Sequence, residues 1–320
     1  MTWIIGVDEA GYGPNLGPFV MTSVACRVPA SCSELDLWQV LRAAARRTAD
    51  ADNGRLLIDD SKRVYTTRGL AGLERGMLAT LWGEQLSVPA SLATLVEWAC
   101  PDDGEELRQE VWYRGVQTIP IHLTVDDLQS TAARFAEVCA AEGVGGWQVR
   151  SVIVCPPRFN ALLEERGTKS HVLAHALTHL LRWQRGNLRD EDDLAFFIDK
   201  HGGRNTYAAM IQHALPDGIV CTAQEGPARS AYRVRGLGRE VQLTFQPRAD
   251  AEHLCVALAS MTSKYLREVL MLEFNRFWQE QVPNLKPTAG YPGDALRFLQ
   301  AIRQALEQLG LSESCIWRRK

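Results

Sequence analysis

Several features by which protein classes are recognised are missing from this sequence. No stretch reaches the roughly 18 consecutive apolar residues that a membrane-spanning helix needs, so no membrane association is expected. The chain opens without a basic segment that leads into an apolar run, and we therefore expect a cytoplasmic protein without a secretory signal. Internal repeats and low-complexity tracts are also missing, which excludes repeat architectures.

Cysteine spacing and net charge exclude two further classes. The eight cysteines form no C-x-x-C pair and most lie in apolar runs, a pattern typical of buried free thiols in a reducing compartment. The formal net charge of −3 argues against a protein that holds nucleic acid by bulk electrostatics, although local basic patches can do so. One such patch is the run 317–320, which we expect to be a solvated face.

The order of apolar runs and turn-forming residues predicts an α/β chain. Strands are expected at about 3–8, 19–28, 119–123, 149–155, 194–198, 218–221, 232–235 and 241–245. Helices are expected at about 33–47, 66–82, 125–141, 158–165, 168–185, 250–280 and 294–309, with Asp250 as the N-cap of the long helix. Residues from about 84 to 147 change in character and contain acidic turns, so we interpret them as an insertion.

Acidic residues stand at the ends of elements in three places. Asp8 and Glu9 end the first strand, Asp199 ends a later apolar run, and Asp250 heads the long helix. Residues at the carboxyl ends of strands project into one crevice, so acids far apart in sequence can share a site. Carboxylates forced together repel one another unless cations lie between them, and oxygen ligands without His or Cys favour Mg²⁺ or Mn²⁺. Taken singly, each acid is better explained as a helix cap or a salt-bridge partner.

Two motifs near the start of the chain resemble those of the ribonuclease HII family. Residues 6–18, with the sequence Gly-Val-Asp-Glu-Ala-Gly-Tyr-Gly-Pro-Asn-Leu-Gly-Pro, resemble the family's opening signature, in which an Asp-Glu pair leads into a Gly-Arg-Gly loop and a Gly-Pro step. Tyr12 stands where the family has Arg. Residues 60–63, Asp-Ser-Lys-Arg, are similar to the family's Asp-Ser-Lys-Lys element.

Further matches follow in the second half of the chain. The residues that fall at the spacing of the family's Asp-led helix are Ala249, Asp250, Ala259, Ser260, Lys264, Arg267 and Met271. Residues 290–292, Gly-Tyr-Pro, resemble the family's Gly-Tyr-Pro turn, and Asp199 fits the strand that carries its third acid, although 200–204 is less typical. The resemblance covers most of residues 3–83 and 148–307.

This resemblance implies that Asp8, Glu9, Asp199 and Asp250 are the catalytic, metal-binding acids of a site for two Mg²⁺ or Mn²⁺ ions. Such a pair of ions, about 4 Å apart, supports in-line attack of water on a phosphodiester.

The resemblance also implies a substrate-binding surface. The backbone of Gly11, Tyr12 and Gly13 would approach a ribose 2′-hydroxyl, the group that separates RNA from DNA, and Tyr291 would stack beside the ribonucleotide. Candidates for phosphate or structural contacts are Ser61, Lys62 and Lys264.

The fold implied is a single ribonuclease H-like domain over 1–320, a mixed sheet flanked by helices, with an insertion at about 84–147 and a C-terminal helical portion at about 250–320. The activity implied is hydrolysis of the phosphodiester 5′ of a ribonucleotide in an RNA/DNA hybrid or in ribonucleotide-containing DNA. The products would carry 5′-phosphate and 3′-hydroxyl ends, and a monomer is expected.

Two alternatives stay open at this point. Tyr12 and the insertion favour a structure-selective nuclease of the same superfamily, while a catalytically inactive nucleic-acid-binding protein is disfavoured because all four acids are present. The row His171, His175 and His179 shares one helix face and could mimic a metal site, but its apolar neighbours favour a core helix with polar intruders.

Overall fold

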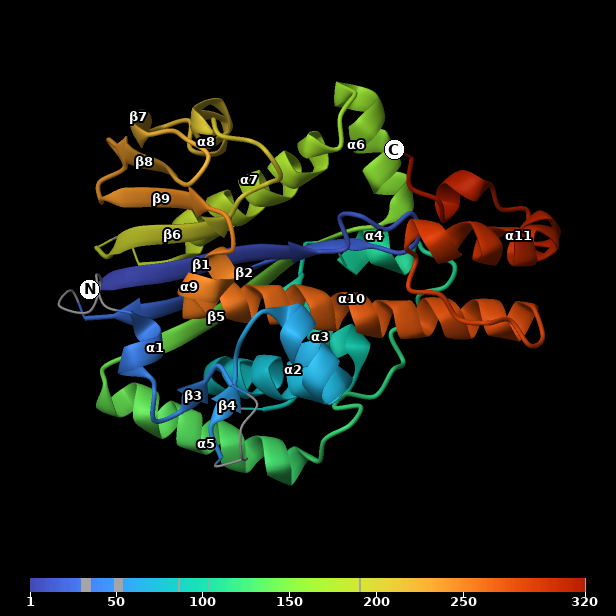
Figure 1. Cartoon of the computed structure of the whole chain (residues 1–320), viewed down its shortest axis with the longest axis horizontal. Coiled ribbons are helices and arrows are strands. Elements are labelled where there is room, and N and C mark those ends of the chain that lie inside the picture. Colours follow the sequence, from blue (N-terminus) through green and yellow to red (C-terminus); the bar gives the residue numbers. More distant parts are fainter. Residues whose placement is uncertain (30–35, 49–53, 86, 103, 190, 320) are drawn as a thin grey trace.

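The computed structural model describes residues 1–29, 36–48, 54–85, 87–102, 104–189 and 191–319. Its centre is a seven-stranded mixed sheet in the order β5-β2-β1-β6-β9-β8-β7 (Figure 1). These strands are β1 (Thr2–Ala10), β2 (Phe19–Val28), β5 (Gly145–Val154), β6 (Asp193–Asp199), β7 (Ile219–Gln224), β8 (Ser230–Arg235) and β9 (Val241–Gln246). Strand β1 pairs antiparallel with β2 and parallel with β6, which in turn pairs parallel with β9. The carboxyl ends of β1, β6 and β9 therefore meet at one edge.

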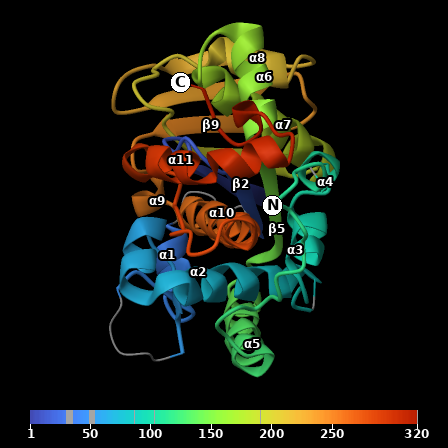
Figure 2. The ribbon, with the colours of Figure 1, turned by 90° about the vertical axis from the view of Figure 1, so that its right-hand side faces the viewer.

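Helices cover both faces of the sheet, as Figures 1 and 2 show. One face carries α6 (Pro156–Arg166), α7 (Ser170–Asn187) and α8 (Ala208–Ala214). The other carries α2 (Ser61–Gln85), α3 (Leu92–Ala99), α5 (Val125–Ala141), α9 (Ala249–Glu252) and α10 (Leu254–Gln281), with α11 (Pro292–Gln308) at one end. The short helix α4 (Gly104–Arg108) lies between α7 and α3 in Figure 2. A short α1 (Leu37–Val40) leads into a small parallel pair, β3 (Ala45–Arg46) and β4 (Leu56–Leu57). The expected mixed sheet flanked by helices, with a helical C-terminal portion, is confirmed.

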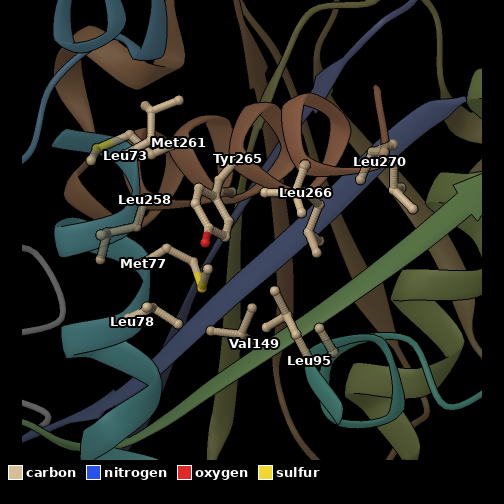
Figure 3. Close-up of a cluster of buried hydrophobic side chains, with 14 of the residues drawn as sticks. Leu73, Met77, Leu78, Leu95, Val149, Leu258, Met261, Tyr265, Leu266 and Leu270 are labelled. Atoms are coloured by element: carbon tan, nitrogen blue, oxygen red, sulfur yellow. The ribbon is translucent and has the colours of Figure 1, made fainter. Parts of the chain in front are cut away.

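The long helix α10 fixes the geometry of the molecule because it packs directly on β1. Gly6 makes this contact possible, since a Cβ atom there would lie 2.1 Å from the carbonyl carbon of Cys255. Figure 3 shows the other side of α10, where apolar side chains pack against α2, α3 and β5. The labelled side chains are Leu73, Met77, Leu78, Leu95, Val149, Leu258, Met261, Tyr265, Leu266 and Leu270. The start of α10 is thereby held beside the middle of β1, and Ser263 of α10 donates to the carbonyl of Asp8 near the end of the strand.

Three sequence-based expectations are wrong in detail. The helix expected at 33–47 begins at Leu37 with Asp36 as its N-cap and ends at Val40, because Ala45 and Arg46 pair with β4 instead; 33–35 lie outside the described residues. The strand expected at 119–123 does not form. Asp250 is not the cap of α10 but lies inside α9, and His253 precedes α10.

The segment 84–147 is closely joined to the rest of the chain. Helix α5 packs on α2, α3 packs on β5, and the buried Trp112 ring meets Phe274 of α10 edge-on at 5.7 Å between ring centroids. Its status as an insertion stays a prediction. Across the described residues, no helix combines the length and apolar character needed to span a bilayer.

Candidate active site

The acids predicted to act together come from three elements that converge at one edge of the sheet. Val7 of β1 is paired with Ile198 of β6, so the next residues along the two parallel strands, Asp8 and Asp199, lie side by side. The Oδ1 atom of Asp199 accepts a hydrogen bond of 2.9 Å from the backbone N–H of Ala249, the first residue of α9. Helix α9 is thus held against the end of β6, and its second residue is Asp250.

Electrostatics show that these carboxylates act on one another. Burial first, and then the charges of Glu9 and Asp199, raise the pKa of Asp8 well above its ordinary value. Burial and then Asp199 raise the pKa of Glu9 to about 7. The pKa of Asp250 rises to about 6 through burial, then the charges of Asp60 and Asp199. Each side chain also keeps part of its surface open to solvent, as a group that meets a ligand must.

The donor set fits a hard divalent cation in its chemistry. Asp8, Glu9, Asp199 and Asp250 offer only carboxylate oxygens, and positive charge between them would offset both the burial and the neighbouring negative charges that raise the pKa values of Asp8, Glu9 and Asp250. In the part of the chain that the structure describes, however, no three Asp, Glu, His or Cys side chains are already arranged around a common point for a metal ion. Convergence to metal-bridging distance therefore stays a prediction.

The loop after β1 lies next to these acids and packs against Arg267 and Gly290. Gly11 adopts a φ of 85°, in the left-handed region that favours glycine, and a Cβ atom there would lie 2.6 Å from the Cδ of Arg267. The N–H groups of Asn15 and Leu16 donate to the carbonyl of Gly290 at 2.7 and 3.2 Å. The loop and the 290–292 turn are thus joined.

Two of the predicted substrate-binding residues flank this junction. The Tyr291 side chain is 51% exposed, and the guanidinium of Arg267 lies 5.8 Å from its ring centroid. Gly13 is exposed, with no protein atom within 4 Å of the position that a Cβ would take. Both groups are therefore open to a ligand.

Tyr12, which replaces the family arginine, is accompanied by cations from other elements. The Nζ of Lys169, just before α7, lies 5.8 Å from the centroid of its ring. Burial first, and then the charge of Glu9, raise the Tyr12 pKa, while the charge of Arg204 lowers it. Positive charge from Lys169 and Arg204 thus reaches the position of Tyr12, and sequence reasoning missed both residues because no motif marks them.

The remaining candidates divide into two kinds. Ser61 is buried and accepts a hydrogen bond of 3.0 Å from Ser260, whose side chain lowers the pKa of Asp8, so Ser61 supports the site from α2. Lys62 is exposed, and its charge lowers the pKa of both Glu9 and Asp199, which places it facing the acids.

Lys264 is engaged elsewhere. Its ammonium group pairs with Glu268 at 3.1 Å and lies 4.4 Å from the centroid of the Tyr65 ring. We assign it a structural contact on the surface of α10.

Two other expectations concern residues outside the acidic cluster. The basic run 317–320 was expected to be a solvated face, but Arg318 is fully buried; Lys320 lies outside the described residues. His171, His175 and His179 are not packed in the core but line a groove of about 1190 Å³ between α7 and α8. The apolar face of α7 does form core, as expected.

Comparisons with known proteins return structures but no sequence relatives. No protein-family model matches the sequence, and no curated protein matches it. Ribonuclease HII of Archaeoglobus fulgidus, solved in complex with PCNA, is 14% identical and aligns over 99% of this chain and 94% of its own, with a TM-score of 0.42. Ribonuclease H2 of Pyrococcus horikoshii OT3 is 14% identical over 98% of this chain and 92% of its own, with a TM-score of 0.44.

A third solved structure is Bst-RNase HIII in complex with Mn²⁺, which is 13% identical over 99% of this chain and 66% of its own, with a TM-score of 0.41. Over nearly its whole length this chain is thus similar to ribonucleases HII and HIII, at identities and TM-scores that leave its function to be inferred from the residues of the site.

Proposed function

We propose that this protein is a divalent-metal-dependent endonuclease. Its substrate would be an RNA/DNA hybrid or ribonucleotide-containing duplex DNA, cut at the phosphodiester 5′ of a ribonucleotide to leave 5′-phosphate and 3′-hydroxyl ends. The observation that carries this proposal is that carboxylates from β1, β6 and α9 lie at one sheet edge, where burial and neighbouring acids raise the pKa values of Asp8, Glu9 and Asp250. Repelling acids that stay partly open to solvent are suited to holding cations against a phosphate.

The metal-binding residues in this proposal are Asp8, Glu9, Asp199 and Asp250, and the ions are Mg²⁺ or Mn²⁺. These residues would hold two ions, which when bound would supply an activated water and stabilise charge on the leaving oxygen, so that no protein nucleophile is required. The chain orients this set through the Ala249 N–H, which holds the Asp199 carboxylate. Lys62 adds a positive charge beside the acids, where a phosphate oxygen would lie.

Recognition of the ribonucleotide is assigned to the loop Gly11, Tyr12 and Gly13 together with Tyr291. The loop is adjacent to the acids and Gly13 is open to a ligand, so main-chain groups can come close to a ribose 2′-hydroxyl. Lys169 and Arg204, near Tyr12, provide positive charge for the phosphate backbone. We infer that a monomer suffices, because these residues all come from one chain.

The alternative is a structure-selective nuclease with the same metal site. It is favoured by Tyr12, whose ring lacks the bidentate donors with which an arginine binds phosphate.

A cleavage assay with three labelled duplexes tests the proposal. The first carries one ribonucleotide, the second is an RNA/DNA hybrid and the third is all DNA, each incubated with Mg²⁺ or Mn²⁺. We expect cuts on the 5′ side of ribonucleotides and none in the all-DNA duplex. Equal cutting of all three duplexes would establish the structure-selective nuclease, whereas binding without cleavage in either metal would establish an inactive nucleic-acid-binding protein.

A further inference from the structure

Residues 316–319 pack against the loop that follows β1. Leu16 and Trp317 form an antiparallel bridge, and the N–H of Arg318 donates to the carbonyl of Asn15 at 2.8 Å. The Arg318 side chain is fully buried, and its Nη1 donates to the carbonyl of Gly11 at 2.6 Å. This contact joins residues 307 positions apart in the sequence.

Helix α6 holds the same segment from its other side through Asn160. The Nδ2 of Asn160 donates to the carbonyls of Ser314 and Trp317 at 3.1 and 2.9 Å, and its Oδ1 accepts from the N–H of Arg319 at 2.8 Å. Figure 1 shows this end of the chain beside α6. Arg318 is therefore fixed by neighbours on both sides.

The Arg318 guanidinium lies 4.9 Å from the centroid of the Phe159 ring, but its burial is costly for folding. Burial and then the charge of Arg267 lower the pKa of Arg318 to about 9, so it keeps its charge at neutral pH beside a second buried cation. The Nε and Nη2 atoms of Arg318 and the Nε of Arg267 have no hydrogen-bond partner among the described residues. A buried charge with unpaired donors costs folding free energy, and such costs are expected where a site requires the group.

The bond to Gly11 has a direct consequence for the loop. The carbonyl of Gly11 and the N–H of Tyr12 belong to one planar peptide unit and point in opposite directions. When Arg318 holds this carbonyl beneath the loop, the N–H of Tyr12 is turned to the other side. That N–H makes no hydrogen bond within the described part of the chain, so it can donate to a ligand.

We propose that Arg318 is a positioning residue for ribose recognition, which fixes the Gly11–Tyr12 peptide so that the loop presents a main-chain donor to the ribonucleotide. The proposal deepens the proposed function and rests on it. Its ligand group is the 2′-hydroxyl of a ribonucleotide in duplex.

Kinetics of four variants test this role. Arg318→Met removes the charge, Arg318→Lys keeps it, and Asn160→Ala frees the segment from α6. Arg319→Ala is the matched control because, among the described residues, the Arg319 side chain pairs with the exposed Glu164 alone. With the one-ribonucleotide duplex, R318M and N160A should raise KM up to about tenfold, the upper end of the loss expected for one neutral hydrogen bond between a main-chain N–H and a hydroxyl. The inhibition constant of the all-DNA duplex should stay within about twofold of wild type, since it offers no 2′-hydroxyl.

R319A should match the wild-type protein in both KM and the inhibition constant. R318K keeps the positive charge, so its KM should be close to the wild-type value. A loss of folded protein would lower the apparent kcat but leave KM and the inhibition constant unchanged, so a structural role alone would not give this pattern. An unchanged KM in R318M, or an equal rise in KM and in the all-DNA inhibition constant, would overturn the proposal.

Hydrogen exchange of the protein without substrate tests whether Arg318 restrains the loop, and it does not depend on catalytic activity. R318M should exchange faster than wild type in peptides that cover residues 10–17, and R319A should not. Unchanged exchange in R318M overturns the positioning role. If wild type cuts no ribonucleotide-containing duplex, the proposed function fails, and the exchange result still decides whether Arg318 holds the loop.

Discussion

Asp199 is the residue that connects the acids of the proposed site. Its charge raises the pKa of Asp8, Glu9 and Asp250, and its Oδ1 accepts the hydrogen bond that holds α9 against β6. A neutral side chain of the same shape at this position would therefore separate the electrostatic role from the structural one.

We predict that Asp199→Asn lowers the cleavage rate by about 100-fold or more, because a metal ligand and its charge are lost. The amide oxygen can still accept from the Ala249 N–H, and repulsion with Asp8 and Glu9 is relieved, so the metal-free variant should melt at or above the wild-type temperature. Asp193→Asn, at the other end of β6, is the control and should keep full activity. Full activity in D199N would remove Asp199 from the site.

At the scale of elements, two buried glutamates fasten the segment between α4 and α5. Glu74 of α2 accepts from the N–H groups of Ile121 and His122 at 2.6 and 2.9 Å, and from the Tyr265 hydroxyl at 2.6 Å. Glu273 of α10 accepts three backbone N–H groups of residues 114–117, each at 3.0 Å. Side-chain carboxylates thus replace the strand pairing expected at 119–123.

Substitution of Glu273 should show how much this anchoring contributes. In Glu273→Gln an NH₂ group faces backbone donors, so at least one buried N–H is left unpaired and the free energy of unfolding should fall by about 2 kcal/mol. Glu280→Gln is the matched control, since Glu280 pairs with Arg114 at the surface and should contribute at most about 0.5 kcal/mol. Urea titrations in which both variants lose the same stability would contradict the anchoring role.

Glu110, next to the same segment, should make stability depend on pH. Burial raises its pKa to about 7 from an ordinary value of 4.5, and its carboxyl accepts from the Trp112 Nε1 at 3.0 Å. Because the folded state binds this proton more tightly, the stabilisation is fully present below pH 4.5 and is lost as the pH rises through 7.

Glu110→Gln should therefore be more stable than wild type at pH 8, on the order of 1 kcal/mol after allowance for its partial exposure, and the difference should vanish near pH 4. Thermal unfolding of both proteins from pH 4 to pH 8 measures it. A difference that does not change with pH would mean that Glu110 is charged in the folded protein.

The elements also show where sequence reasoning succeeds. Apolar periodicity predicted the bounds of α5, which buries one stripe, and a β-rich apolar run after a Gly/Pro-rich connection predicted those of β2, which is buried along almost its whole length. The position of the acids at the ends of β1 and β6 could also be predicted, because the carboxyl ends of parallel strands meet at one edge of the sheet. Arg318 could not, because its burial depends on a contact 307 positions away, and nothing in the local run 317–320 signals it.

At the scale of the whole molecule, negative charge is unevenly distributed. The net charge is only −3, yet four mutually repelling carboxylates lie at one sheet edge, where Lys62 is the cation whose charge lowers the pKa of both Glu9 and Asp199. The metal-free fold therefore carries an unfavourable interaction that divalent cations can convert into a favourable one. The melting temperature of the protein should therefore depend on whether the site binds a divalent cation.

We predict that Mg²⁺ or Mn²⁺ raises the melting temperature at pH 8 and that EDTA reverses the change. A cation at 100 times its dissociation constant stabilises the folded state by about 2.7 kcal/mol, a shift of about 4 °C for a chain of this size. The shift should shrink strongly in Asp199→Asn and Asp250→Asn but persist in Glu307→Gln, which removes an exposed acid of α11. Equal shifts in all three variants would place the bound cations elsewhere on the surface, and the carboxylate cluster would then need another explanation than metal binding.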